Sequence, residues 1–382
     1  MDHIPIVMLV TGGRNGSLFF QSLLDGHPEI LQFPGPFLQF SGNSNLDNFI
    51  QQLCLPILPD NLAYQFAIFF PAFFSSSRNP LNRMDQLGDD KNSSFQVSFE
   101  LFKENLDFFL KESNNDKALV IQALHLAYAK ACEDQALSSK KIIVMHIHHA
   151  KYLPLLARFL KFTTLFLDRD PLPSLQSELD GWIRFLGPRV NFCQYAIGVS
   201  RKILEPLRVM AINQPAYTIR IEDIHTDHKN FMEHFCAHFG ITPHPCLVES
   251  TFMGLKWWGD RISEKLINGL NPHFSNKIEI KKFYFWELRW IERAIFNRLK
   301  AYSYPTRSRK FYKNAFWLFL PSKYETKIGW ILIKEIFNGT LSSKRQAIRN
   351  LLGYFRVFNL KIEILRYSKN SDLPPLLWSK ST

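Results

Sequence analysis

The sequence predicts an α/β fold in which helices flank a parallel sheet, followed by a basic helical extension at the C-terminus. Three observations lead to this prediction. An apolar run, a glycine-rich loop and an amphipathic helix follow one another over residues 6–31. Strand-like and helix-like segments then alternate as far as residue 240, which is typical of a parallel sheet because parallel strands need long crossover connections. Positive charge is concentrated beyond residue 306.

The first segment predicts an anion site. Residues 6–10 form a short unbroken apolar run, as in a strand that is buried on both faces. Gly12, Gly13 and Gly16 then allow a tight turn that brings backbone N–H groups close to a ligand. A helix that begins behind such a loop attracts anions, because its first N–H groups lack partners and its dipole points towards them. A phosphate or a sulfate is therefore expected at residues 12–17.

The other elements follow from apolar periodicity, segment length and turn residues. Strands are expected at 141–147, 163–167 and 217–221. Helices are expected at 96–111, 117–132, 152–160, 175–185, 191–209 and 231–239, the last closed by Gly240. Residues 33–94 are rich in proline and are expected to form a loop-rich insertion. The chain is thus divided into one domain over residues 1–306 and an extension over residues 307–382.

The charge and the cysteines narrow the class of protein. Residues 307–382 contain 15 Lys and Arg but 4 Asp and Glu, out of 46 and 34 in the whole chain, so the body is almost neutral. A basic body would favour nucleic acid as a partner, whereas a basic tail favours an accessory surface, so no nucleic acid is expected. The five cysteines are scattered without metal-ligand spacing, which predicts reduced thiols, a cytoplasmic protein and no bound metal.

The loop differs from the common nucleotide-binding loops. The nucleoside-triphosphate loop reads Gly-x-x-x-x-Gly-Lys-Ser/Thr. Here the spacing from Gly12 to Gly16 is one residue shorter, Ser17 follows the second glycine without a lysine, and Arg14 lies inside the loop. The dinucleotide pattern Gly-x-Gly-x-x-Gly is absent as well. A plain glycine turn between a strand and a helix stays open as the alternative.

Two further segments follow predicted strands, and the carboxyl ends of parallel strands are where ligands bind. In the first, His146 and His148 share one face of a strand, because strand side chains alternate. In the second, Arg169 leaves a strand end and Ser177 lies on the helix that follows. A guanidinium with a helical hydroxyl suits a second phosphate. A salt bridge from Arg169 to a neighbouring aspartate is the alternative.

Together these segments resemble the sulfotransferases that use 3′-phosphoadenosine-5′-phosphosulfate (PAPS). Four stretches match in order across residues 5–305, and they are 13–30, 169–177, 219–224 and 256–260. The resemblance implies a P-loop-like sulfotransferase fold. It also implies that the 5′-phosphosulfate is held by Gly13, Arg14, Asn15, Gly16, Ser17 and Leu18, the 3′-phosphate by Arg169 and Ser177, and the nucleotide by a loop with Trp258 and Gly259.

The same resemblance implies roles in catalysis. Arg14 would stabilise charge on the transferring group, and His146 would be the base, with His148 and His149 as alternatives. Leu18 stands where many family members have Ser or Thr, and His148 replaces a proline of the family's Thr-His-Leu-Pro segment. PAPS is the expected sulfate donor, without a metal, and a hydroxyl or amine is the expected acceptor group.

The acceptor, the role of the tail and the activity itself leave alternatives open. Residues 307–382 mix basic and aromatic residues, which fits either a helical extension packed on the body or a contact with anionic lipid or glycan. In the second case the protein would associate peripherally with a membrane, and the acceptor would be a saccharide or a glycolipid. A non-catalytic nucleotide-binding protein and, less favoured, a P-loop kinase are the rival functions. Glu222 and Asp223 are expected to support the structure.

Overall fold

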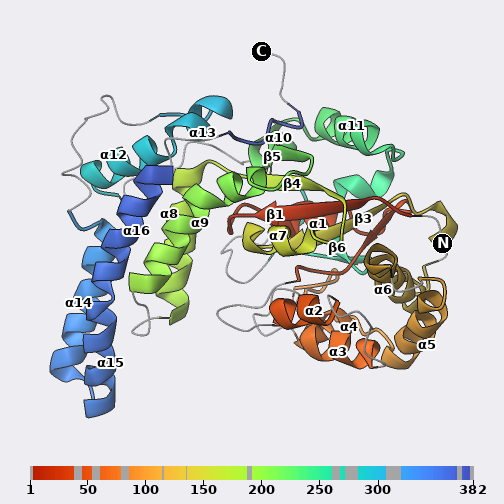
Figure 1. Ribbon diagram of the computed structural model, residues 1–382, viewed down its shortest axis with the longest axis horizontal. Helices are drawn as coiled ribbons and strands as arrows, with labels where there is room; N and C mark the ends of the chain where they lie inside the picture. The colour runs from red at the N-terminus through yellow and green to blue at the C-terminus, as the bar shows by residue number, and fades with distance from the viewer. Residues whose placement is uncertain are drawn as a thin grey trace.

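The core of the protein is a five-stranded parallel sheet with the strand order β2-β3-β1-β4-β5 (Figure 1). The computed structural model describes residues 3–37, 45–53, 61–78, 86–113, 116–134, 136–186, 192–259, 267–271, 283–306, 320–367 and 372–378. The strands are β1 (Ile6–Thr11), β2 (Ile30–Gln32), β3 (Ile142–Ile147), β4 (Phe162–Asp168) and β5 (Ala216–Arg220). The predicted parallel sheet flanked by helices is therefore confirmed, with β2 as a short additional strand.

The two faces of the sheet are covered by different helices because side chains alternate along each strand. In β1, Val7 and Leu9 face one hydrophobic cluster, while Ile6, Met8 and Val10 face another. The first cluster is covered by α1 (Ser17–Leu23), α10 (Ile221–Thr226) and α11 (His228–Phe239). The second is covered by α2 (Asn45–Leu53), α3 (Leu62–Phe69), α4 (Pro71–Phe74), α5 (Phe99–Leu110), α6 (Lys117–Ala131) and α7 (Leu153–Leu156).

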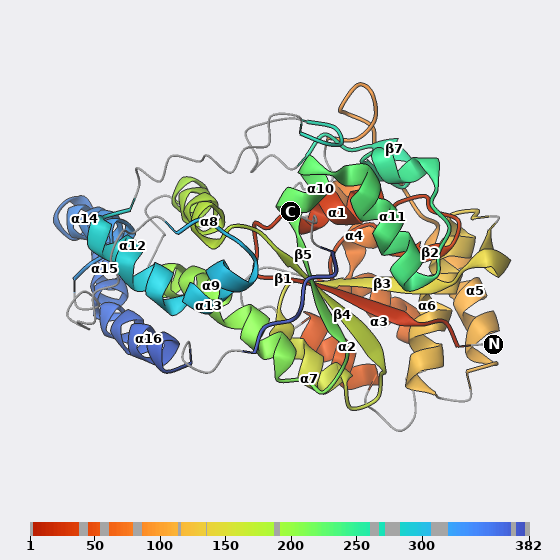
Figure 2. The same cartoon turned by 90° about the horizontal axis from the view of Figure 1, so that it is seen from above.

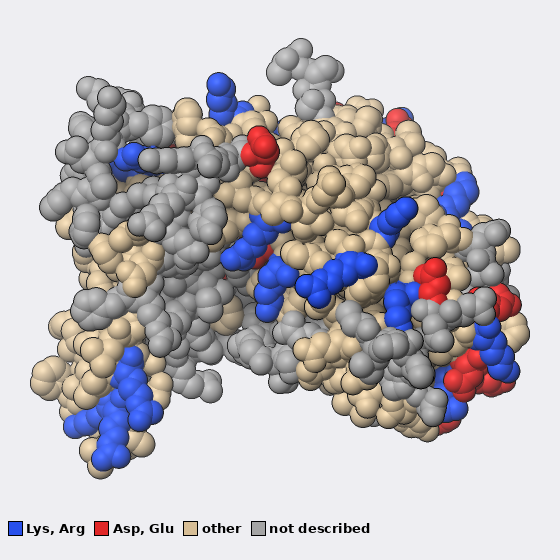
Figure 3. Space-filling model, in the orientation of Figure 1, with Lys and Arg blue, Asp and Glu red and all other residues tan. Residues whose placement is uncertain are grey.

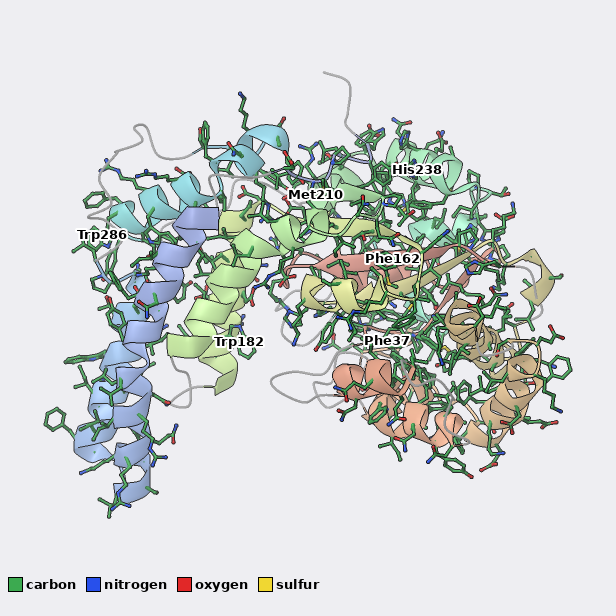
Figure 4. The ribbon with its side chains drawn as sticks, in the orientation of Figure 1. Phe37, Phe162, Trp182, Met210, His238 and Trp286 are labelled. Carbon is green, nitrogen blue, oxygen red and sulfur yellow. The ribbon has the colours of Figure 1, made fainter. Side chains whose placement is uncertain are left out.

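The segment expected to be a loop-rich insertion, residues 33–94, is more ordered than predicted. It contains α2, α3 and α4, whose aromatic side chains pack into the layer below the sheet. Phe33 stacks on Phe73 with ring centroids 4.9 Å apart, and Phe37 lies edge-on to Phe70 at 4.9 Å. Figure 4 marks Phe37 in this layer and Phe162 at the sheet above it. The prolines hid these helices because Pro71 begins a helix, where its missing N–H is not needed.

Local signals explain several element boundaries. Asp116 caps α6 by accepting from the N–H of Ala118 at 2.8 Å, and Gly240 ends α11 with a φ of 64°. The helix α8 (Pro171–Leu186) begins at Pro171, because a proline fits the first turn of a helix. By contrast, α7 is shorter than the predicted helix at 152–160.

The C-terminal helices pack on α8 and on α9 (Phe192–Met210), beside the sheet (Figure 2). They are α12 (Phe285–Ala294), α13 (Phe296–Ala301), α14 (Lys323–Asn338), α15 (Leu341–Leu352) and α16 (Tyr354–Tyr367). The chain then returns to β5, where the N–H of Leu377 donates to the carbonyl of Thr218 at 2.9 Å. Residues 307–319, 368–371 and 379–382 of the predicted extension lie outside the described residues. Among the helices that are described, none combines the length and the apolar character needed to cross a bilayer.

Candidate functional site

Three segments with candidate residues meet at the carboxyl ends of neighbouring strands. The glycine loop follows β1, the histidines end β3, and Arg169 follows β4. The central strand β1 pairs with both neighbours, so that Leu9 lies beside His146 and Thr11 beside Leu167. The parallel topology thus brings to one edge of the sheet three segments that are far apart in sequence.

The loop adopts a conformation that turns its carbonyl groups inwards. Gly13, Arg14 and Gly16 all have positive φ angles, of 82°, 50° and 80°. The carbonyl of Gly13 accepts from Nζ of Lys202, and that of Arg14 lies 3.3 Å from Oγ of Ser174. In a planar trans peptide the N–H points opposite to the C=O. The N–H groups that follow these carbonyls therefore point away from α8 and α9, towards the open side of the loop.

Four consecutive backbone N–H groups of this loop have no acceptor within the described chain, and they belong to Asn15, Gly16, Ser17 and Leu18. Asn15, Ser17 and Leu18 are buried. Buried N–H groups are nearly always hydrogen-bonded, because leaving one unpaired costs about 1–3 kcal/mol. Since α1 has only seven residues, the attraction for an anion comes from these N–H groups rather than from a long helix dipole.

Gly16 is required by its surroundings as well as by its backbone angle. A Cβ atom at this position would lie 2.9 Å from Cδ1 of Ile221, the first residue of α10. Its φ of 80° is the left-handed conformation that side chains disfavour. A side chain at residue 16 would therefore displace the loop from α10.

Lys202, on α9, contacts the glycine loop, and this role was not predicted from the sequence. Its buried Nζ donates to Gly13 O, lies 3.0 Å from Oδ1 of Asn15 and 2.6 Å from Oγ of Ser174, and pairs with Glu178 at 3.4 Å. Its position one turn after the buried Val199 was a usable signal, because a lysine on the apolar face of a helix needs an internal partner.

Arg169 reaches the loop from the end of β4. Its Nη1 lies 3.4 Å from the carbonyl of Arg14. Of its two neighbouring aspartates, Asp168 pairs with the buried Arg298, whereas the charge of Asp170 acts to raise the pKa of Arg169. Burial lowers the pKa of Arg169, the Glu222 carboxylate opposes this shift, and the positive charge of Arg14 adds to it. Two guanidinium groups thus lie close enough to repel each other, which an anion would relieve.

Ser177 and Ser174 lie one turn apart on α8 but have different roles. Ser174 is buried, and its Oγ lies 2.6 Å from Oδ1 of Asn15, so it belongs to the support of the loop. Ser177 is half-buried, and no hydrogen bond of its hydroxyl is found among the described residues. The sequence singled out Ser177 and missed Ser174.

Glu222 and Asp223 hold the site together, as expected. Glu222 accepts from the N–H of Asp170 at 2.9 Å, at the start of α8. Burial raises the pKa of Glu222 to about 7. Asp223 pairs with Arg220, accepting from Nε at 2.7 Å.

Gln21 determines the protonation of His146 and is a second residue that the sequence analysis missed. The Nε2 of Gln21 donates to the carbonyls of Phe33 at 2.8 Å and Gly35 at 3.2 Å, so its Oε1 faces Nδ1 of His146 at 2.7 Å. A carbonyl oxygen can only accept, which assigns the proton to Nδ1. In the neutral ring the lone pair is therefore on Nε2, as a base requires.

The other two candidate histidines differ in position. The ring of His148 lies 4.7 Å from that of His146, and both side chains are buried. His149 is more exposed, with its Nδ1 3.9 Å from Glu205.

The side chain of Trp258 contacts the segment that contains Gly88 and Lys91. It follows the short ribbon of β6 (Thr251–Phe252) and β7 (Leu255–Lys256), and its indole N–H donates to the carbonyl of Gly88 at 2.7 Å. The Nζ of Lys91 lies 4.4 Å from the ring centre. Gly259 has a φ of 96°, and the residues that follow it lie outside the described chain. The expected contact of Trp258 with a nucleotide stays a prediction.

The described residues contain no group of three or more His, Cys, Asp or Glu side chains that could hold a metal ion. No protein-family model and no curated protein matches the sequence. Among solved structures, the chain is similar to the sulfotransferase domain from the Synechococcus PCC 7002 olefin synthase, with 15% identity and a TM-score of 0.37 over 72% of this chain and 89% of that one. It is also similar to the sulfotransferase domain from the curacin biosynthetic pathway, with 14% identity and a TM-score of 0.35 over 87% of this chain and 99% of that one.

Proposed function

We propose that this chain is a sulfotransferase that moves a sulfuryl group from PAPS to a hydroxyl or amine of an acceptor. The observation that carries the proposal is the row of four N–H groups at residues 15–18 without acceptors, with Arg14 and Arg169 beside it. The order of the sequence motifs, which resembles that of the PAPS-dependent sulfotransferases, supports the 5′-phosphosulfate of PAPS as the anion that this row would bind.

The residues present fit the two anionic ends of PAPS. The N–H groups of residues 15–18, the hydroxyl of Ser17 and the guanidinium of Arg14 would hold the 5′-phosphosulfate. Arg169 and the hydroxyl of Ser177 would hold the 3′-phosphate, since both project from the segment after β4. Preorganised donors of this kind stabilise charge without reorganising during the reaction. The absence of the lysine of a triphosphate loop between Gly16 and Ser17 disfavours ATP.

His146 would accept the proton of the acceptor group at Nε2. Gln21 keeps Nδ1 protonated and so leaves the lone pair on the other nitrogen. When bound, PAPS supplies the sulfuryl group and departs as 3′-phosphoadenosine-5′-phosphate (PAP). A neutral imidazole with its lone pair on the free nitrogen is the form that can take up this proton. His149, which is more exposed, is the alternative base.

Thermal unfolding with candidate nucleotides tests the binding part of the proposal. PAP is expected to raise the melting temperature, since a ligand at a hundred times its Kd adds about 2.7 kcal/mol of stability. ATP with Mg²⁺ is expected to have no comparable effect. Arg169→Ala should reduce the shift, while Arg158→Ala should keep it, because the exposed Arg158 lies between α7 and β4, at the opposite edge of the sheet. Stabilisation by ATP but not by PAP would favour a kinase.

Transfer of labelled sulfate from PAPS into cell extracts tests the catalytic part. Labelled product is expected with the wild-type chain and is expected to be lost in His146→Ala. Binding of PAP without transfer into any lipid, glycan or small-molecule fraction would favour the non-catalytic nucleotide-binding protein.

A further inference from the structure

The hairpin formed by α14 and α15 exposes an unusual amount of apolar surface. In α15 only Ala347 is buried. Seven large apolar side chains between residues 330 and 352 are exposed, and they are Trp330, Ile333, Phe337, Leu341, Ile348, Leu351 and Leu352. Phe337 is 75% exposed and Leu341 is 69% exposed, so these side chains are not part of the edge of a buried core. Apolar exposure gathered in one place marks an interaction surface.

The exposed apolar residues are ordered along each helix. On α14 they lie at positions 330, 333 and 337, and on α15 at positions 341, 348 and 352. Spacings of three, four, seven and eleven residues place side chains on one face of a helix. Each helix therefore has one face turned to the core or to its partner and a second apolar face turned outwards.

Cations accompany these faces. Five of the six Lys and Arg residues on the hairpin lie beyond its first turn, and they are Lys327, Lys334, Lys344, Arg345 and Arg349. Of its two acidic residues, Glu325 is buried and pairs with Lys361, which leaves Glu335. No ion pair of Lys344, Arg345 or Arg349 is found in the described part of the chain. The Nζ of Lys334 lies 5.8 Å from the ring centre of Trp330, so charge and apolar surface are adjacent.

The hairpin lies at the outside of the molecule, where a large binding partner could contact it. Figure 1 shows α14 and α15 projecting beyond α8 and α9 at the side of the molecule away from α5 and α6. In Figure 3, Lys and Arg side chains gather at the free end of this projection, with no acidic side chain drawn among them on that face. At the other end, the buried pair of Lys361 and Glu325, 2.7 Å apart, joins α16 to α14.

We propose that the α14–α15 hairpin is a docking surface for an anionic lipid bilayer. Amphipathic helices with aromatic and aliphatic residues on one side and Lys or Arg beside them lie in the interfacial plane of membranes. Anionic headgroups complement the five cations, and the exposed Trp330, Phe337 and Leu352 enter the boundary of the acyl chains. A second copy of this chain fits less well, because a symmetric contact would bring the same cations face to face.

Vesicle flotation of the full chain tests this docking surface. The chain is expected to float with vesicles of phosphatidylcholine and phosphatidylserine, and not with phosphatidylcholine alone. A charge variant, Lys344→Gln, Arg345→Gln and Arg349→Gln combined, should weaken binding by roughly a hundredfold, since each cation near the surface contributes about a factor of five. Binding by the wild-type chain should also fall with added salt.

Two further variants make the test specific. An apolar variant, Trp330→Gln, Phe337→Gln and Leu352→Gln combined, should also lose flotation while keeping the melting temperature of the body. The matched control is Lys111→Gln, Arg158→Gln and Lys161→Gln combined, which removes the same charge from exposed positions on the body. It should float like the wild-type chain.

Three results would overturn the proposal. One is absence of flotation of the wild-type chain with phosphatidylserine vesicles. Another is an equal loss of binding in the charge variant and in the control. The third is a dimer in light scattering that the apolar variant converts to a monomer while flotation is unchanged, which would assign the surface to a second copy.

Discussion

Replacing Lys202 by methionine removes the cation beneath the glycine loop with little change in side-chain volume. Its Nζ contacts the carbonyl of Gly13, Oδ1 of Asn15 and the carboxylate of Glu178, and both charged side chains are 4% exposed or less. The substitution leaves the Gly13 carbonyl with only the longer contact to Oγ of Ser174, at 3.5 Å, and the buried carboxylate without this cation. We therefore expect effects on both stability and nucleotide binding.

The expected loss of stability is about 3–5 kcal/mol, the cost of removing one partner of a buried ion pair. Adding Glu178→Gln to Lys202→Met should recover most of this loss, because the double variant no longer buries the charge. The affinity for PAP should fall at least about tenfold, equivalent to ~1.4 kcal/mol, and should not recover in the double variant. The Gly13 carbonyl, which Lys202 holds, would then be able to turn.

Urea unfolding and titration with PAP measure the two effects. The matched control is Lys361→Met, which breaks the buried pair with Glu325 between α14 and α16, at 2.7 Å. We expect a comparable loss of stability in this control with unchanged PAP affinity. If Lys202→Met binds PAP as tightly as Lys361→Met does, the assigned role of Lys202 in shaping the loop is refuted.

Three further predictions concern the loop, the pH dependence and the base. Gly16→Ala should weaken PAP binding and lower the free energy of unfolding by about 1–2 kcal/mol or more. The control is Gly254→Ala, at φ 72° with open space around it, which should leave PAP binding intact. Equal effects of the two variants on PAP binding would contradict this prediction. Burial raises the pKa of Glu222 from 4.5 to about 7, so its contribution to the free energy of unfolding is fully present below about pH 4.5. About 3 kcal/mol of this contribution is lost as the pH rises through 7. Glu222→Gln should remove this part of the pH dependence in urea unfolding, and an unchanged pH dependence would refute the assignment. Gln21→Leu should lower kcat of sulfate transfer and shift its pH profile without changing PAP affinity, and a profile like that of wild type would exclude Gln21 as the partner that orients His146.

Features with local signals could be predicted from the sequence. The strand at 6–11, the glycine turn and the helix after it are encoded in adjacent residues, and all three are present. The meeting of this loop with Arg169 and His146 could also be predicted, because the carboxyl ends of parallel strands share one edge of the sheet. The Gly240 helix end follows in the same way from the left-handed conformation that glycine tolerates.

Features that depend on distant partners could not be predicted in this way. Lys202 contacts a carbonyl 189 positions away, and Gln21 contacts a histidine 125 positions away. In the sequence each is one polar residue in an amphipathic helix, and only the packing reveals its hydrogen-bond partner. The helices of the insertion were missed because their prolines lie at helix starts and in the segments between helices, where they do not break a helix.

The most direct test of the proposed function compares PAP with AMP, which lacks the 3′-phosphate, by titration calorimetry on the wild-type chain and on Arg169→Ala. Charge-assisted hydrogen bonds contribute about 1.5–3 kcal/mol each, so the wild-type chain should bind PAP roughly ten- to a hundredfold more tightly than AMP. In Arg169→Ala most of this preference should be lost, since only Ser177 is left to contact the 3′-phosphate. Equal binding of PAP and AMP by the wild-type chain, or an undiminished preference for PAP in Arg169→Ala, would contradict the account of this site.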